Sequence, residues 1–255
     1  MRKLLAAALL ALSTLPAHAG DGPTLAAGFD YSSGKYGGGE AIEMLFLPLT
    51  AKYESGPYTL KLTVPYIELS GPANVIGNTS GNMAIPLAGA GPQRTVAGLG
   101  DVQAGLGYNA YFDPDRQFAL DLATRIKFAT ADAEKGLGTG KNDLSLQCDA
   151  YKTSGDTTFM ASLGYKWTGK PAGSDYRNVA YASVGLQHRF GGDFSAGILW
   201  DVRQSVLSTL SDQREITLHF TRGLAPHWKA LAYLYAGTTP SSPNAGLGAS
   251  LNHDF

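Results

Sequence analysis

The strongest constraint on this chain is a period-two alternation of apolar and polar side chains that recurs along most of its length. In FALDLATRIKF, residues 118–128, Leu120 and Leu122 fall on one face and Asp121 on the other. Successive side chains of a β-strand point to opposite faces, so this pattern predicts strands with one apolar and one polar face. The same alternation appears in YTLKLTVPY, DVQAGLGYNAYF and TFMASLGYKW.

The alternation and the turn signals together predict an up-and-down sheet. About twelve strands are expected, at roughly 24–33, 40–53, 58–70, 98–112, 117–129, 142–153, 157–168, 178–190, 193–204, 213–222, 228–237 and 245–255. Tight connections such as DPDR and TSGDT alternate with longer ones such as 130–141. Tight turns at one end and long loops at the other are typical of membrane barrels.

Strand alternation alone also fits a soluble barrel or sandwich, and three features favour the membrane. Charged residues make up only 16% of the chain, and the polar faces carry many small residues. Spans of about ten residues suit tilted strands that cross a bilayer. Aromatic residues flank the tight turns as an interfacial girdle would: Tyr53 and Tyr58, Phe112 and Phe118, Phe190 and Phe194, Phe220 and Trp228. We therefore predict an all-β fold, a closed transmembrane antiparallel barrel.

The two ends of the chain indicate export to the outer membrane of a Gram-negative bacterium. Residues 1–19 combine basic residues, a short apolar run and a small-residue cleavage site, which predicts a signal peptide followed by one barrel over 20–255. The lone Cys148 cannot form an internal disulfide. The final strand ends in Phe255, which resembles the terminal signal read by the barrel assembly machinery. The net charge of −1 gives no reason to expect nucleic-acid binding.

Three segments resemble a known family. These are GLGDVQAGLGY (98–108), RIKFATADAEKGLGTGKNDLSL (125–146) and LTVPYIELSGP (62–72). They resemble the outer-membrane transporter family named for the MetA pathway of phenol degradation, whose members show Gly-Leu-Gly-Asp leading into a strand and a Gly-rich loop closing on Gly-x-x-Asp. Ala129 and Ala131 replace the Pro and Gly of the family pattern. The resemblance implies an outer-membrane barrel that takes up small or aromatic compounds.

The stretch GLGTGKND, residues 136–143, resembles a phosphate-binding loop but lacks its spacing. Such a loop needs four residues between its first Gly and the Gly-Lys pair, followed by Ser or Thr. Here three residues intervene, and Asn142 stands in place of the hydroxyl. We therefore predict an outer loop, with Asp143 as the first inward residue of the next strand.

The inward faces carry the candidate functional residues. Asp101 is expected opposite Lys127, and Lys127 near Asp143, where opposite charges on antiparallel neighbours attract. Two interpretations remain open: a charge ladder that lines a pore, or an ion-pair network that fills and stiffens a narrow barrel. The pore-lining candidates are Asp101, Gln103, Asp121, Arg125, Lys127, Asp143, Asp149, Arg203 and Glu215.

No cofactor, metal site or enzymatic activity is expected. His188, His219, His227 and His253 lack the spacing of metal ligands. His219 with a nearby Ser is the only hint of an outer-membrane lipid hydrolase, and no nucleophile motif accompanies it.

The favoured function is passive uptake of a small-molecule solute, aromatic or apolar, across the lipid bilayer. The alternative is a closed structural or adhesive barrel. Eight-stranded barrels are filled and sixteen-stranded ones hold channels, so about twelve strands do not decide between the two.

Overall fold

The computed structural model describes residues 21–78, 83–87 and 91–255. The predicted signal peptide at 1–19 lies outside the described residues. Within the described ranges no helix is long and apolar enough to cross a membrane.

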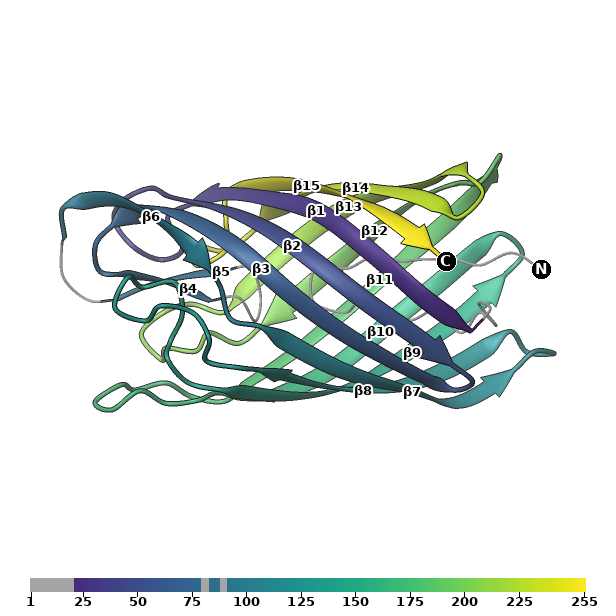
Figure 1. Ribbon diagram of the computed structural model, residues 1–255, viewed down its shortest axis with the longest axis horizontal. Coiled ribbons are helices and arrows are strands. Elements are labelled where there is room, and N and C mark those ends of the chain that lie inside the picture. The colour runs from purple at the N-terminus through teal and green to yellow at the C-terminus, as the bar shows by residue number, and fades with distance from the viewer. Residues whose placement is uncertain (1–20, 79–82, 88–90) are drawn as a thin grey trace.

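One closed antiparallel sheet forms the wall of a barrel (Figure 1). Each strand pairs with its neighbours, and the last strand pairs with the first, which closes the wall. The prediction of about twelve wall strands is confirmed. They are β1 (Gly22–Gly34), β2 (Ile42–Ser55), β3 (Tyr58–Pro72), β7 (Gln103–Asp113), β8 (Phe118–Lys127), β9 (Asp143–Ser154), β10 (Thr157–Trp167), β11 (Val179–Gly191), β12 (Phe194–Arg203), β13 (Gln213–Ala225), β14 (Trp228–Gly237) and β15 (Ala245–Asp254).

Tight turns lie at one end of the barrel and long loops at the other, as the sequence predicts. The C-terminus lies at the tight-turn end (Figure 1). Several turns place a residue in the left-handed region, including Gly56 at φ 54° and Gly155 at φ 59°, where glycine carries no steric cost. A β-bulge between Asn109 and Tyr111 shifts the register of β7 near its turn, and such bulges are frequent at barrel rims.

The outer surface of the wall is apolar, and the inner surface is polar. On β8, Leu122 is 49% exposed on the outside, while Asp121 beside it is 3% exposed on the inside. The aromatic girdle is also in place, since Tyr53, Tyr58 and Trp228 are exposed near the tight turns. An apolar exterior on a closed barrel is suited to lipid, because every backbone group in the wall can pair with a neighbouring strand.

The predicted strand at 98–112 is not continuous. The chain forms β6 (Gln93–Leu99), breaks at residues 100–102 and resumes as β7. Beyond Tyr66, β3 pairs with β6, whereas its first residues pair with β7. The break occurs where Asp101 bonds to the Lys127 amine, 2.7 Å away.

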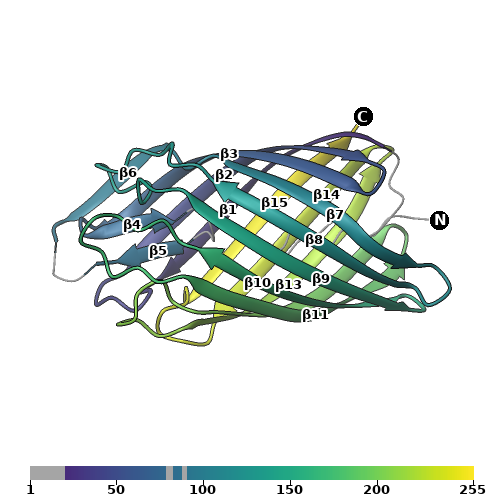
Figure 2. The same cartoon turned by 90° about the horizontal axis from the view of Figure 1, so that it is seen from below.

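The predicted long loop at 71–97 also contains two short strands, β4 (Val75–Asn78) and β5 (Met83–Pro86), which pair as a hairpin. Both lie at the long-loop end of the barrel (Figure 2). Asn74 and Leu87 are hydrogen-bonded to each other at its base.

The polarity of β2 and β3 inverts at their outer ends. Near the turn between them, polar residues face inward, but beyond Tyr66 the inward residues Ile67 and Leu69 are apolar and buried. At the same level two outward-facing residues, Glu43 and Glu68, are acidic and exposed. A charged exterior is costly in lipid, so this inversion marks where the two strands leave the bilayer and enclose an apolar core.

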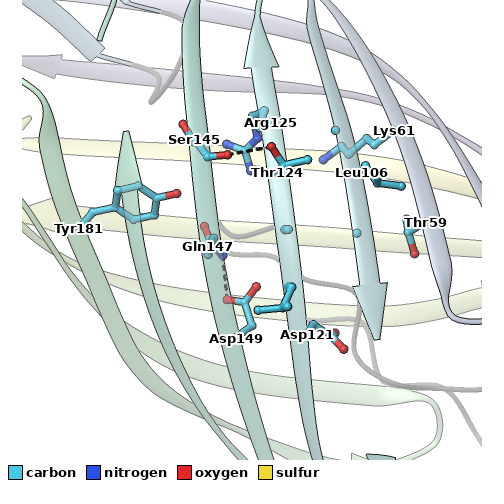
Figure 3. Close-up of a pocket in the computed structure, with 14 residues that line it drawn as sticks. Thr59, Lys61, Leu106, Asp121, Thr124, Arg125, Ser145, Gln147, Asp149 and Tyr181 are labelled. Carbon is cyan, nitrogen blue, oxygen red and sulfur yellow. Dashed lines mark hydrogen bonds between the residues drawn. The ribbon is translucent and has the colours of Figure 1, made fainter. Parts of the chain in front are cut away.

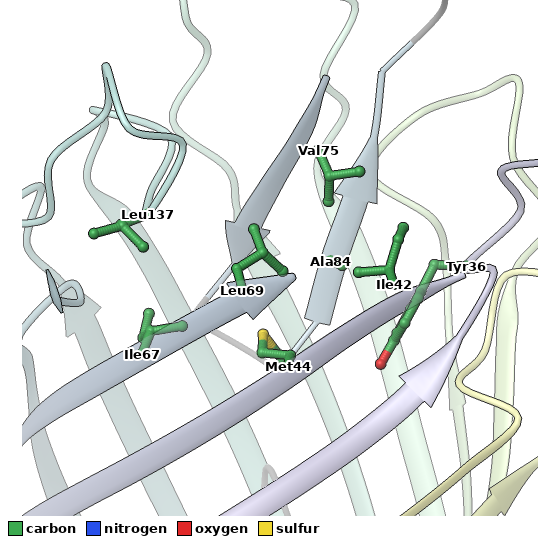
Figure 4. Packing of buried hydrophobic residues seen from close by; sticks show 8 residues of the cluster. All are labelled: Tyr36, Ile42, Met44, Ile67, Leu69, Val75, Ala84 and Leu137. Carbon is green, nitrogen blue, oxygen red and sulfur yellow. The ribbon is translucent and has the colours of Figure 1, made fainter. Parts of the chain in front are cut away.

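The hairpin of β4 and β5 crosses the outer mouth of the barrel. Val75 and Ala84 belong to an apolar cluster on the β2 and β3 side, which also includes Tyr36, Ile42, Met44, Ile67, Leu69 and Leu137 (Figure 4). Ile85 of the hairpin belongs instead to a cluster with Tyr176, Val179, Val206 and Leu207. These residues come from β11 and the adjacent loops, five strands away from β3 around the wall. The hairpin therefore packs against two opposite sides of the mouth.

Candidate functional site

Basic side chains form one register row across the lumen wall. Lys52 pairs with Lys61, and the row continues through Gly105 to Arg125. From Arg125 it passes through Ser145 to Lys166. We call Lys52, Lys61, Arg125 and Lys166 the cation row. Small residues separate the charged ones over β7 and β9, which spaces like charges that would otherwise repel each other across adjacent strands.

Acidic side chains form a second row on the tight-turn side of the first. Asp121 pairs with Asp149, and the row runs through Ser162 and Ser183 to Asp201 and then to Glu215. We call Asp121, Asp149, Asp201 and Glu215 the carboxylate row. On β8 the two rows are four residues apart, at Asp121 and Arg125.

Side-chain amides donate hydrogen bonds to the two carboxylates that face each other on β8 and β9. The Asn109 side chain donates to Asp121 at 2.6 Å, and the Gln147 side chain donates to Asp149 at 2.7 Å. Because like charges on paired residues repel, these donors stabilise Asp121 and Asp149 opposite each other.

A pocket of about 50 Å³ opens between the rows (Figure 3). Lys61, Arg125, Asp121, Asp149 and Tyr181 line it. The floor includes two small residues of the register row between the charged ones, Gly107 and Ala123, and the same row continues through Gln147 to Gly164. Opposite charges therefore meet across a hollow in the wall.

Glycine creates this hollow in two ways. At Gly107 an added Cβ would meet its nearest neighbour at 3.4 Å, an ordinary contact, so the missing side chain leaves open volume. At Gly164 an added Cβ would fall 2.2 Å from the ring of Tyr181, so the ring lies directly over the glycine. Substitution of Gly164 would displace Tyr181 from the wall of the pocket.

Lys127 is the centre of a separate, buried cluster. Its amine donates to Asp101 at 2.7 Å, to Thr139 at 3.2 Å and to the carbonyl of Lys141 at 2.9 Å. Asp143 lies 3.8 Å from the same amine. The side chains of Asp101, Lys127 and Asp143 are 0–3% exposed.

The same cluster holds the outer loop at 128–142. The Ala131 amide donates to Asp101 at 3.0 Å, and the Gly136 carbonyl accepts from Gly77 of the hairpin at 2.8 Å. Leu137, 1% exposed, is the member of the apolar cluster that this loop supplies. GLGTGKND is thus the outer loop that the sequence predicts, and Asp143 begins β9 on the inside.

Two phenols at the outer mouth stay neutral. Burial raises the pKa of Tyr36 above its ordinary value, and its hydroxyl donates to Ser32 at 2.7 Å. Burial likewise raises the pKa of Tyr176. By contrast, the hydrogen bond from the Lys135 backbone lowers the pKa of the exposed Asp132.

The nine residues predicted to line the pore lie in different parts of the lumen. Asp101, Lys127 and Asp143 meet in the buried cluster, and Asp121, Arg125 and Asp149 line the pocket. Arg203 pairs in register with Tyr181 at the pocket edge, and Glu215 ends the carboxylate row. Gln103 lies at the start of β7, paired with Lys127 and Thr63.

Sequence reasoning missed Lys61, Lys166 and Tyr181 as site residues. A signal for Lys61 was available, because the ESGP turn sets Lys52 opposite Lys61. Lys52 forms an ion pair with Glu54, with 2.7 Å between Nζ and Oε2, so Lys61 is the member of this facing pair whose charge lies at the pocket. The positions of Lys166 and Tyr181 follow only from the register of distant strands.

Two of the described histidines lie near each other, since the ring centroids of His227 and His253 are 6.3 Å apart. Among the described residues no group of three or more His, Cys, Asp or Glu side chains could hold a metal ion. His219 is 1% exposed, and its Nε2 atom lies 3.4 Å from the side-chain Oε1 atom of Gln187.

The closed strand wall, the apolar exterior and the charged lumen define an outer-membrane β-barrel. A family model described as "Putative MetA-pathway of phenol degradation" matches residues 46–214, and the chain belongs to this family. The resemblance noted in the sequence is thereby confirmed. A comparison with curated proteins gives no match.

Solved structures share the barrel fold at low sequence identity. The COG4313 outer membrane channel from Pseudomonas putida F1 is 12% identical, with a TM-score of 0.74 over 94% of this chain and 98% of that chain. The translocator domain of the autotransporter NalP from Neisseria meningitidis is 12% identical, with a TM-score of 0.57 over 94% and 91%. The deltaS2S3 mutant of TodX, a monoaromatic hydrocarbon channel of P. putida, is 11% identical, with a TM-score of 0.53 over 93% and 91%.

Proposed function

We propose that this protein is a passive channel that carries small solutes through its lumen across the outer membrane. The charged pocket between the cation row and the carboxylate row is the observation that carries this proposal. A barrel that only needs to fill its interior can do so with directly paired charges, as the Lys127 cluster does. The pocket instead leaves basic and acidic groups around open volume, which is what a permeating solute requires.

Small aromatic or apolar compounds are the proposed solutes. The description of the family refers to phenol degradation. The similar TodX mutant is named as a monoaromatic hydrocarbon channel. Tyr181 supplies an aromatic surface at the pocket. On this proposal the chain is no enzyme, and the solute passes unchanged.

Export and assembly belong to the same proposal. Residues 1–19 would be removed as a signal peptide, leaving the barrel of residues 20–255 in the bilayer. Phe255, 67% exposed beyond the last strand, would be read by the barrel assembly machinery.

Conductance across a planar bilayer tests the channel proposal. Purified mature protein is expected to give discrete current steps, and phenol at increasing concentration is expected to reduce them by occupying the lumen. A folded, inserted barrel that gives no steps would contradict a channel function.

A closed structural barrel is the second candidate, and the outer mouth favours it. The hairpin of β4 and β5 packs against two opposite sides of the mouth, and the Lys127 cluster holds the neighbouring loop. If this closure is permanent, the inserted barrel will not conduct at any voltage. The lipid hydrolase alternative has weaker support, because the side chain within hydrogen-bonding distance of His219 is that of Gln187, which is no nucleophile.

A further inference from the structure

We propose that the pocket binds small organic acids that also carry a hydroxyl group, with the acid group on the cation row and the hydroxyl on Asp149. This proposal adds a class of solute to the proposed channel function. It rests on that function for the passage of the solute across the membrane. The binding step itself concerns only the pocket.

The cation row has unused positive charge. Lys166 is 5% exposed, and within the described part of the chain it forms no hydrogen bond or ion pair. The carboxylate that attracts it, Asp143, is already shared with Lys127 and with the Gly169 amide. Lys61 likewise has no hydrogen bond or ion pair among the described residues. Lys61 lines the pocket, whereas Lys166 lies further along the row, so an incoming carboxylate would be stabilised at the Lys61 ammonium.

Lys61 and Arg125 meet at the same pocket. Their strands are separated only by β7, which contributes Gly105 between them. An added Cβ at Gly105 would lie 3.8 Å from the Lys61 side chain, so glycine leaves the two cations facing shared open volume. Figure 3 shows both side chains with Tyr181 around this volume. Two cationic donors around one hollow suit the two oxygens of a carboxylate.

The acidic side of the pocket selects a second group. Asp149 is 1% exposed, and its Oδ1 atom accepts from Gln147 and Ser162. Its Oδ2 atom is buried and has no hydrogen-bond partner among the described residues. This oxygen, with Asp121 beside it, would repel a plain anion that came too close. A hydroxyl group on the solute would instead donate to the Oδ2 atom and satisfy it.

The volume of the pocket limits what binds inside it. A volume of about 50 Å³ is too small for a whole aromatic ring, so only the polar groups of the solute enter the pocket. The remainder of the solute must lie in the lumen beside Tyr181. The site is therefore a contact made during passage, and its affinity is expected to be weak.

Fluorine NMR on the folded mature barrel in detergent micelles tests this proposal without requiring transport. The probes are 3-fluoro-4-hydroxybenzoate, 4-fluorobenzoate, neutral 4-fluorobenzamide and cationic 4-fluorobenzylammonium. The hydroxylated acid is expected to bind most tightly and the plain acid next. The amide and the amine are expected to bind weakly. Equal affinity for the acid and the amide, or tightest binding of the amine, would overturn the proposal.

Substitutions in the pocket, with a matched control outside it, test whether the acids bind in the pocket. Lys61→Gln is expected to weaken both acids by about tenfold, the loss that follows removal of a hydrogen bond to a charged group. Asp149→Asn is expected to abolish the preference for the hydroxylated acid over the plain one. Lys170→Gln, which removes an exposed lysine of an outer loop, is the control and should change nothing. Equal effects of Lys61→Gln and Lys170→Gln would place the binding outside the pocket.

Conductance measurements distinguish a failure of the channel proposal from a failure of the binding-site proposal. A barrel that binds the acids and passes no current would refute the channel and leave the site standing. A barrel that conducts and binds all four probes alike would leave the channel standing and refute the site.

Discussion

Lys127 shows how one buried charge organises a region of this barrel. Its amine contacts two carboxylates, a hydroxyl and a carbonyl, and through them joins β8 to the break at 100–102, to β9 and to the outer loop at 128–142. Each additional hydrogen bond helps to offset the cost of burying the charges. We infer that this cluster serves structure, in contrast to the pocket, where charges surround open volume.

Replacing Lys127 with Met tests that inference. The change removes the amine that lies within 4 Å of both Asp101 and Asp143 and leaves the two carboxylates buried. Breaking such a buried pair costs about 3–5 kcal/mol of folding free energy. The midpoint of urea unfolding in lipid vesicles, followed by gel mobility, measures the loss.

Lys135→Met is the matched control for Lys127. Lys135 lies in the same loop, and its side chain is 59% exposed in an ion pair with Asp132. A surface pair of this kind contributes roughly 0–1 kcal/mol. If both variants unfolded at the same urea concentration, the buried cluster would not stabilise the fold.

At the scale of elements, the hairpin of β4 and β5 is the part that distinguishes this barrel from a bare strand wall. Its two faces join apolar clusters on opposite sides of the mouth. Hydrogen bonds at its base between Asn74 and Leu87 keep its ends together. The hairpin lies between β3 and β6, so its removal deletes no residue of a wall strand.

Replacing residues 75–86 with a Gly-Gly link is expected to raise single-channel conductance, because the crossing hairpin obstructs the outer mouth. The control deletes the exposed turn at 171–174, which lies outside both apolar clusters and should leave conductance unchanged. Unchanged conductance in the hairpin variant would show that ions do not pass this end of the lumen.

At the scale of the whole molecule, the sequence predicts the strands of the barrel wall far better than the arrangement of side chains in the lumen. Side-chain alternation is a local property, so the faces of Leu122 and Asp121 follow from their positions alone. The Lys127 pairs also follow, because a single turn and a single loop bring their strands together. The cation row does not, since it depends on the register of five pairings around the barrel.

The hairpin of β4 and β5 could not be predicted from the sequence, for a different reason. Its strands have four residues each, too few to display a periodic pattern. One readable signal does point to it. Glu43 and Glu68 occupy outward positions where lower residues of β2 and β3 are apolar, and Ile42 and Leu69 turn inward. Such an inversion of the alternation indicates an apolar core inside the outer mouth.

The central claim, that solutes cross through the lumen past the pocket, is tested most directly by chemical block of an engineered cysteine. Cys148→Ser first removes the native thiol, which lies on the lipid face. Ala123→Cys then places a thiol on the pocket floor. A charged methanethiosulfonate reagent added during a bilayer recording is predicted to cause a lasting fall in conductance in the Ala123→Cys barrel and none with only native Cys148. Current that persists unchanged after the introduced thiol has been labelled, as mass spectrometry would verify, would contradict conduction through this lumen.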